Sequence, residues 1–560
     1  MESLGMITTQ PRGSRIPAVL ALALLATVAC TRGGNCRAEY CGTLVLAATG
    51  SVTTLLPPMS SAAAERNIFD QIFLRLADYT VGGSTIGDSG FVPQLAQSWE
   101  WTDPLTLTFH LDPHARWQDG VPVTAADVQF TFESYTDTAL ASGDLTALAH
   151  IASVTATDSL TAVFRFRDRY PEAFFDATFH MRILPAHLLR NVPRHDWRTA
   201  AFGRAPIGNG PYRFVRWTPG ESVELTADSG FYLGRPHVRR LIWRFAADMS
   251  VAVTQLVAGE ADAIEVLVGP ANIDRAQTAG HLKLYPYPGV TYTFMRFNLR
   301  ANGDSLHPNP VFAEADVRRA LILATDRERM LQSATGGHAK VPPGPMPQQW
   351  SWLWVPELTP PPFDTAQAGR LLTARGWRDS DGDGIRDRAG RRLSFHVAVP
   401  TSALRRQYAR LLQEQLRAVG AELVIDEMDD AAMGDRLHAG TFDAALESWQ
   451  TDPTPTSGVP QIWSKGGGAN YGGYANPAFD RAVAAAAIAQ TPGAARAAWV
   501  AAFRTLAQDA PAIMLYALDN VAAVDDRVTD VELRPDSWMA LVRNWRIPPD
   551  RLNERDRVGH

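Results

Sequence analysis

The segment from Phe91 to Phe132 constrains the fold strongly, because it joins an alternating strand to a turn and a helix start. Between Leu105 and Leu111, apolar residues alternate with threonine and histidine, which is the period of a half-buried strand. An Asp-Gly pair then supplies a tight turn, and Thr124 is placed to cap the helix that follows. Pro93 is expected to open another helix ahead of the strand. The segment therefore predicts a compact α/β unit.

Strands and helices are expected to alternate along the rest of the chain as well, which favours an α/β architecture. Short apolar runs predict strands, and apolar residues spaced three or four apart predict helices. The strands are expected at 42–48, 213–217, 291–300, 422–426 and 442–446, and the helices at 62–76, 316–330 and 408–419.

The first 29 residues have the pattern of a signal peptide. Arg12 and Arg15 precede an apolar run, Ile16 to Ala29, that is too short to span a bilayer as a stable helix. The run ends in Thr-Val-Ala before Cys30, which looks like the box after which a bacterial lipoprotein is cleaved and lipidated on the cysteine. The sequence thus predicts export and a lipid anchor on Cys30, with plain secretory cleavage as the alternative.

The chain has three cysteines, Cys30, Cys36 and Cys41. If Cys30 carries lipid, Cys36 and Cys41 are left to pair across a short loop in an oxidising compartment. The alternative is two free thiols.

Length and charge narrow the class of protein. A chain of 560 residues is long enough for two or three domains. Its formal net charge is −6 at pH 7 and it contains no basic run, so nucleic-acid binding is not expected. No second apolar segment approaches the length of a membrane span.

Four separated segments, in the same order, resemble one known family, the bacterial extracytoplasmic solute-binding proteins of family 5. These are the oligopeptide and dipeptide receptors of ABC importers. The segments are 91–132, Ile-Gly-Asn-Gly-Pro-Tyr at 207–212, Leu-Val-Ala-Gly-Glu-Ala-Asp at 256–262, and Phe-Asn through Asp-Arg at 297–327.

The resemblance implies a receptor of the type II periplasmic binding protein class, with two lobes joined by a hinge and an extra α/β domain. Residues 1–29 would be the signal peptide and 30–41 the tether. Lobe I would comprise 42–85, 206–290 and 506–560, the extra domain 86–205, and lobe II 291–505. Such a receptor is a monomer without a cofactor. It closes over a peptide or similar small solute and presents it to the permease of an ABC importer.

The segment Ser448 to Thr456 is the main candidate site. In peptide-binding members of the family a Trp three residues before an Asp stands here, and that Asp holds the α-ammonium group of the ligand. Trp449 and Asp452 keep this spacing, and they are expected on a loop that leaves the strand 442–446. Tyr471 is a weaker candidate for packing on the ligand. The alternatives are that Asp452 caps a turn before a proline and that Tyr471 is structural.

The sequence does not identify the ligand. Dipeptide receptors of the family carry an Arg for the ligand carboxylate near the strand end at 399–402, where this chain has Val-Pro-Thr-Ser. Arg405 and Arg406 fit better as solvated helix residues. A longer peptide, or another solute with a cationic nitrogen, needs no such Arg.

An extracytoplasmic hydrolase or metal-dependent enzyme on a similar fold is the alternative function. Gly-Asp-Ser-Gly at 87–90 resembles the nucleophile motif of trypsin-like proteases, but those enzymes place His and Asp before the Ser, and the first histidine here, His110, follows it. The histidines also lack the spacing of a zinc site. The acidic run Asp379 to Asp387 matches the first half of a calcium loop, yet its twelfth position is Gly390. An Asp-Gly turn is the alternative there. We therefore expect neither a set of catalytic residues nor a metal centre.

Overall fold

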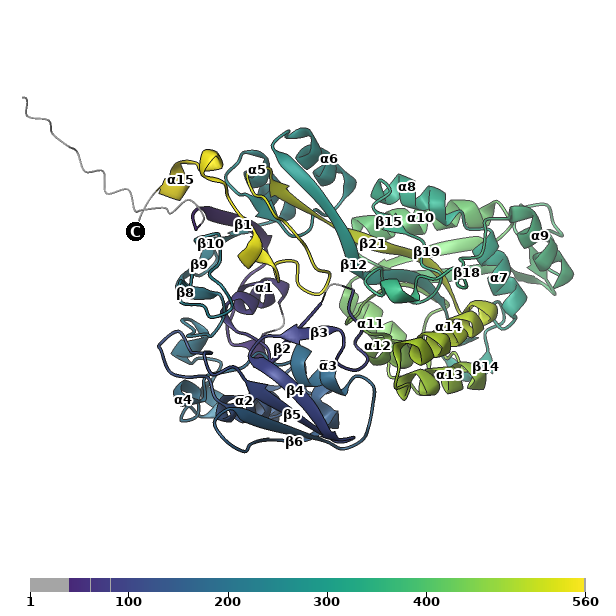
Figure 1. Cartoon of the computed structure of the whole chain (residues 1–560). Coiled ribbons are helices and arrows are strands. Elements are labelled where there is room, and N and C mark those ends of the chain that lie inside the picture. Colours follow the sequence, from purple (N-terminus) through teal and green to yellow (C-terminus); the bar gives the residue numbers. More distant parts are fainter. Residues whose placement is uncertain (1–39, 61, 81, 558–560) are drawn as a thin grey trace, which may run out of the picture.

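The computed structural model, which describes residues 40–60, 62–80 and 82–557, has an eleven-stranded sheet that runs through both halves of the molecule (Figure 1). Its strand order is β19-β18-β20-β12-β21-β11-β1-β10-β9-β8, with β15 beside β21. The strands are β1 (Thr43–Thr49), β8 (Tyr212–Thr218), β9 (Ser222–Ala227), β10 (Arg240–Ala246), β11 (Ala263–Ile264), β12 (Leu282–Phe297), β15 (Ala339–Lys340), β18 (Ser394–Pro400), β19 (Glu422–Met428), β20 (Ala444–Gln450) and β21 (Ala512–Asp525). The expected α/β architecture is confirmed.

Two long antiparallel strands, β12 and β21, belong to both halves of this sheet (Figure 1). Their pairing shifts register between Pro288 and Tyr292. Gly289 lies within the shift, where a Cβ atom would stand 2.1 Å from the carbonyl oxygen of Leu518, so the two backbones can approach only because residue 289 is glycine. The lobe boundary expected at 290/291 falls at this irregularity. The boundary expected at 505/506 falls inside helix α14 (Pro492–Asp509).

A second, four-stranded sheet lies in the region 86–205, in the order β4-β5-β7-β6. Its strands are β4 (Ala96–Asp103), β5 (Thr106–Leu111), β6 (Ile151–Ala156) and β7 (Thr161–Phe166). The expected strand and the helix after Thr124, α2 (Ala125–Tyr135), are confirmed, and the Asp127 carboxylate accepts the backbone N–H of Thr124 at 2.8 Å. The helix expected at Pro93 is wrong. Phe91–Pro93 is strand β3, because it pairs with β2 (Ala77–Tyr79).

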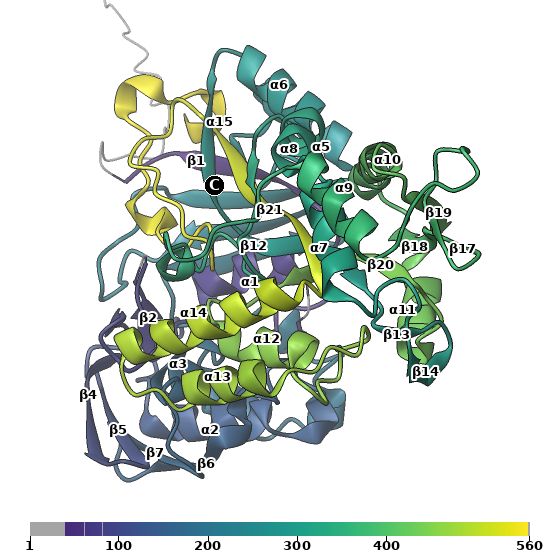
Figure 2. The same ribbon diagram turned by 90° about the vertical axis from the view of Figure 1, so that its right-hand side faces the viewer.

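Helices cover both faces of the sheet in the second half of the molecule (Figure 2). One face carries α7 (Ala315–Leu323), α8 (Arg327–Thr335), α9 (Thr365–Ala374) and α10 (Ala403–Arg417), and the other carries α12 (Pro455–Trp463), α13 (Pro477–Ala487) and α14. The single helix expected at 316–330 is two helices. Asp326 begins the second, since its carboxylate accepts the backbone N–H of Arg329 at 3.1 Å.

In the first half, α1 (Ala63–Ile72) packs in one core with the region 86–205, while α5 (Met249–Val257) and α6 (Pro270–Thr278) cover the opposite face of the sheet. Asp262, at the end of the 256–262 segment, is fully buried. Its carboxylate accepts the Val45 backbone N–H at 2.7 Å and the Arg527 Nε–H at 2.8 Å. This residue therefore ties the first strand to the chain's C-terminal segment. The remaining helices are α3 (Ala173–Phe179), α4 (Ala186–Leu189), α11 (Asp430–Ala439) and α15 (Glu554–Arg557).

The expected signal peptide, Cys30 and Cys36 lie outside the described residues. Cys41 is disulfide-bonded. Within the described ranges, none of the helices combines the length and the apolar character needed to cross a membrane.

Candidate functional site

A cavity of about 1170 Å³ lies between the two halves of the molecule. One wall comes from α1 and the chain after it, from the region 141–198, and from the C-terminal segment 535–538. The other wall comes from the loop after β20 and the start of α12, between Gln450 and Gln461. The cavity is slightly larger than the 300–1,000 Å³ of ordinary small-molecule pockets.

Asp452 lies in the second wall, as expected for a ligand-binding residue. Its backbone carbonyl accepts hydrogen bonds from Gln349 Nε2 and Trp350 Nε1, both at 2.8 Å, which fix the position of the loop. The carboxylate accepts one hydrogen bond, from Ser457 Oγ at 3.2 Å. Because no side chain of the described residues forms an ion pair with it, the carboxylate is available to a cation in the cavity.

Trp449 and Tyr471 do not line this cavity. The strand expected to end at Leu446 continues to Gln450, because β20 stays paired with β12 to that point, and Trp449 lies within it opposite Tyr292. The expectation that Trp449 lies on the loop is therefore wrong. The Tyr471 ring packs against His438 at a tilt of 58°, with ring centroids 4.9 Å apart, and its centroid lies 5.6 Å from the Arg296 guanidinium.

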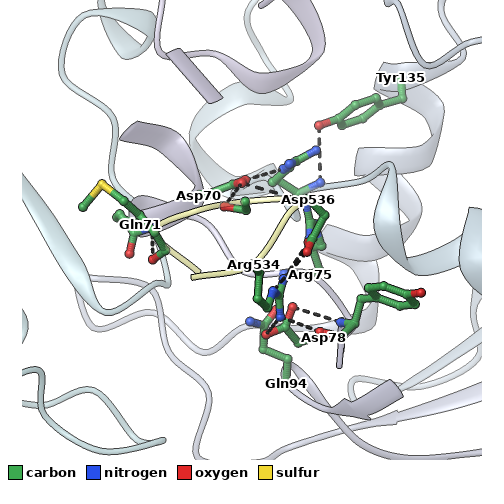
Figure 3. Close-up of polar contacts among 12 residues, drawn as sticks. Asp70, Gln71, Arg75, Asp78, Gln94, Tyr135, Arg534 and Asp536 are labelled. Atoms are coloured by element: carbon green, nitrogen blue, oxygen red, sulfur yellow. Dashed lines mark hydrogen bonds and ion pairs between the residues drawn. The ribbon is translucent and has the colours of Figure 1, made fainter. Parts of the chain in front are cut away.

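The first wall contains a network of three buried arginines and three half-buried aspartates, drawn in Figure 3. Arg182 Nε donates to Asp70 at 2.7 Å. Arg534 donates to Asp536 at 2.7 Å and pairs with Asp78 at 3.0 Å. The sixth member, Arg75, lies beside Asp70. Sequence reasoning missed this network, since its members come from segments as far apart in the chain as Asp70 and Asp536 and carry no local motif.

His180 forms a second charged group in the same wall. Its ring nitrogens lie 3.1 Å from Asp144 and 3.4 Å from Asp176. Burial lowers the pKa of His180, but the hydrogen bonds and charges of the two carboxylates outweigh it and raise that pKa to about 10. His180 is therefore a permanent cation near neutral pH.

Glu172 connects the two walls. Its carboxyl group accepts hydrogen bonds from Thr85 Oγ1 at 3.0 Å and from Thr454 Oγ1, which belongs to the loop of Asp452. Burial, reinforced by the charge of Asp176, raises the pKa of Glu172 to about 7. The neutral form of Glu172 is therefore favoured at this contact between the walls.

This shift predicts a pH dependence that Glu172→Gln removes. The pKa of Glu172 in the folded protein lies above its value of 4.5 in the unfolded chain, so its contribution to stability is complete below pH 4.5 and is lost as the pH rises through 7. From pH 5 to 8 the free energy of unfolding of the wild type should fall by about 2 kcal/mol more than that of Glu172→Gln. Urea denaturation at each pH measures this.

The control is Glu133→Gln, which changes an exposed glutamate on α2. It should leave the wild-type pH dependence in place. Parallel curves for the wild type and Glu172→Gln would show that the carboxyl group of Glu172 does not change its ionisation on folding.

The acidic run at 379–387 forms a turn on the surface. Oxygens of Asp379, Asp381 and Asp383 lie within 4.8 Å of one another, and all three residues are exposed. The Asp379 carboxylate accepts the backbone N–H groups of Gly382 at 2.7 Å and Gly384 at 3.1 Å, while Asp383 pairs with Arg392. These bonds are those of an Asp-Gly turn. They give no support to a calcium site.

Residues 90–471 of this chain match the sequence model of a protein family, the bacterial extracellular solute-binding proteins, family 5 Middle. The oligopeptide-binding protein AppA of Bacillus subtilis is 26% identical over 444 residues, which cover 77% of this chain and 78% of that protein.

Solved structures show the same fold. The structure of AppA from Bacillus subtilis in complex with a nonapeptide has a TM-score of 0.70 at 23% identity, over 91% of this chain and 99% of that one. The ABC transporter substrate-binding protein CtaP from Listeria monocytogenes has a TM-score of 0.78 at 22% identity, over 91% and 100% of the two chains.

Proposed function

Since the chain belongs to the bacterial extracellular solute-binding proteins of family 5, we propose that it is a non-enzymatic receptor that captures a peptide and delivers it to the permease of an ABC importer. The observation that carries the proposal is the large cavity, in whose wall the carboxylate of Asp452 forms no ion pair with any described residue. A peptide amino terminus supplies the cation that such a carboxylate needs. The naming of AppA as an oligopeptide-binding protein supports a peptide ligand over other solutes.

Capture requires two lobes that close, and we propose the division expected from the sequence with one change, a last boundary within β21 instead of at 505/506. Lobe I then comprises 42–85, 206–290 and the chain after that boundary. The extra domain comprises 86–205, and lobe II runs from 291 to the same boundary. The register shift between β12 and β21 supports a hinge near Gly289, because irregular pairing weakens a sheet locally. Helix α14 packs in the core of the second half, which favours moving the last boundary into β21.

Binding of unmodified peptides tests the proposed function. The purified protein is mixed with an equimolar pool of peptides of two to nine residues, passed over a gel filtration column, and examined by native mass spectrometry. We expect retained peptides and, in small-angle scattering, a smaller radius of gyration with ligand. Absence of any retained peptide would contradict a peptide receptor, and an unchanged scattering profile at saturation would contradict closure.

We also propose that the protein is exported and held at the membrane through lipid on Cys30, because the apolar run before it ends in small residues and cysteine. Cys30→Ala should then move the protein from the membrane fraction to the soluble extracytoplasmic fraction. Cys36→Ala is the matched control and should stay with the membrane. A parent protein without an acyl group by mass spectrometry would refute the anchor.

A further inference from the structure

Arg75 is a buried cation whose side chain has no hydrogen-bond partner among the described residues. The residue is 6% exposed and lines the cavity. Its Nε atom is buried without a partner, and its single ion pair, to Asp70, has a long N···O distance of 3.9 Å. A buried guanidinium normally donates several hydrogen bonds, so this one is incompletely satisfied.

The neighbouring carboxylates point their oxygens at other donors rather than at Arg75, and Asp70 stays at the 3.9 Å given above (Figure 3). Arg182 and Ser537 use the two oxygens of Asp70, at 2.7 and 3.3 Å. Arg534 uses both oxygens of Asp536, at 3.2 and 2.7 Å. The oxygens of Asp78 accept the Tyr79 backbone N–H at 3.0 Å and pair with Arg534 at 3.0 Å.

The position of Arg75 is nevertheless fixed. Its guanidinium lies 4.5 Å from the ring centroid of Phe179, and its backbone N–H donates to Gln94 Oε1 at 2.7 Å. Burial and the charge of Arg182 lower the pKa of Arg75, and the carboxylates of Asp70, Asp78 and Asp536 offset this only in part. Arg66 and Arg198, which also line the cavity and form no ion pair with a described residue, are both exposed to solvent.

We infer that the Arg75 guanidinium binds a carboxylate group of the captured peptide. The guanidinium fork matches a carboxylate in two parallel hydrogen bonds, and a site removed from water strengthens them. The inference rests on the peptide receptor proposed above and adds an anionic contact in the wall opposite Asp452. The carboxylate can come from the peptide's C-terminus or from an acidic side chain.

A competition experiment tests the inference. Three equimolar peptide pools are offered to the protein together: one without Asp or Glu and with free C-termini, the same pool amidated, and an amidated pool with one Glu in each peptide. Retained peptides are quantified by liquid chromatography and mass spectrometry. We expect the neutral amidated pool to be retained about 10- to 100-fold less than the free-acid pool. Recovery in the Glu pool would assign the carboxylate to a side chain.

Variants assign the preference to Arg75. Arg75→Gln should bring the free-acid to amide ratio close to one, whereas Arg198→Gln should retain it. Arg75→Lys keeps a positive charge beside Asp70, so it is used in place of Arg75→Gln if Arg75→Gln does not fold. It should reduce the free-acid to amide ratio, because lysine lacks the planar guanidinium group.

The outcomes are separable. Equal retention of all three pools by the wild type, or an unchanged ratio in a folded Arg75 variant, overturns the inference and leaves the peptide receptor in place. Retention of no pool contradicts the receptor itself, and the inference with it.

Discussion

Replacing Glu447 with alanine is expected to lower the free energy of unfolding by about 3–5 kcal/mol. Glu447 and Arg296 form a buried pair, with side chains 8% and 1% exposed. Their contacts are bidentate, with Nε to Oε1 at 2.5 Å and Nη2 to Oε2 at 3.0 Å. Loss of the carboxylate leaves the arginine buried with one weaker bond, to the Ile462 carbonyl at 3.3 Å, which is the reason for the large cost.

Denaturant unfolding of the purified variant measures this cost. Arg406→Ala is the control, because its pair with Glu427 lies on the surface, and it should cost less than about 1 kcal/mol. A double variant, Arg296→Met with Glu447→Leu, should recover most of the loss, since neither charge then remains unpaired. A Glu447→Ala protein within 1 kcal/mol of the parent would mean that the site admits water.

The same pair links stability to the site. Arg296 lies on β12 and Glu447 on β20, so the pair joins a strand shared by both halves of the sheet to the strand that leads to Asp452. The rings of Phe294 and Trp463 pack against the guanidinium, with centroids 5.3 and 5.1 Å away. This packing holds the C-terminal end of α12 against the sheet, and thus supports the wall of the cavity that carries the loop.

Local patterns predicted many elements correctly, because the hydrophobic period acts over a few residues. The strand at Thr106–Leu111 and the helix Ala403–Arg417 are examples. Errors arose where tertiary pairing decided the outcome. The segment at Pro93 is a strand because β2 lies beside it, and the extent of β12 depends on pairing with β21, which is more than 200 residues away.

For the candidate site, too, local patterns predicted some residues and tertiary contacts decided the others. Asp452 was expected at the ligand site from the resemblance of its short segment to the family, and the structure places it in the cavity wall. The position of Trp449 could not be predicted, because the end of β20 depends on its partner strand. Arg75, Glu172 and Arg534 carry no sequence signal, since their environment is built by residues distant in the chain, as the contact of Arg534 with the Tyr79 carbonyl illustrates.

Asp452→Asn should leave the fold intact and weaken peptide binding by about 2–5 kcal/mol, or roughly 30- to 5,000-fold. The loop is held by its backbone carbonyl, which the substitution keeps, so the geometry of the wall should persist. What is lost is the negative charge opposite the peptide's ammonium group, which would then be buried without compensation. Asp435→Asn, an exposed change on α11, is the control. Calorimetry with a peptide retained by the wild type measures the difference.

N-acetylation of the same peptide identifies the partner of Asp452, because it removes the ammonium charge from the ligand side. If Asp452 binds that group, acetylation should weaken binding to the wild type by a similar factor and have little further effect on Asp452→Asn. The two changes then remove one interaction rather than two. Additive losses would assign the ammonium group to another residue, and a folded Asp452→Asn protein with parental affinity would reduce Asp452 to a turn residue before Pro453.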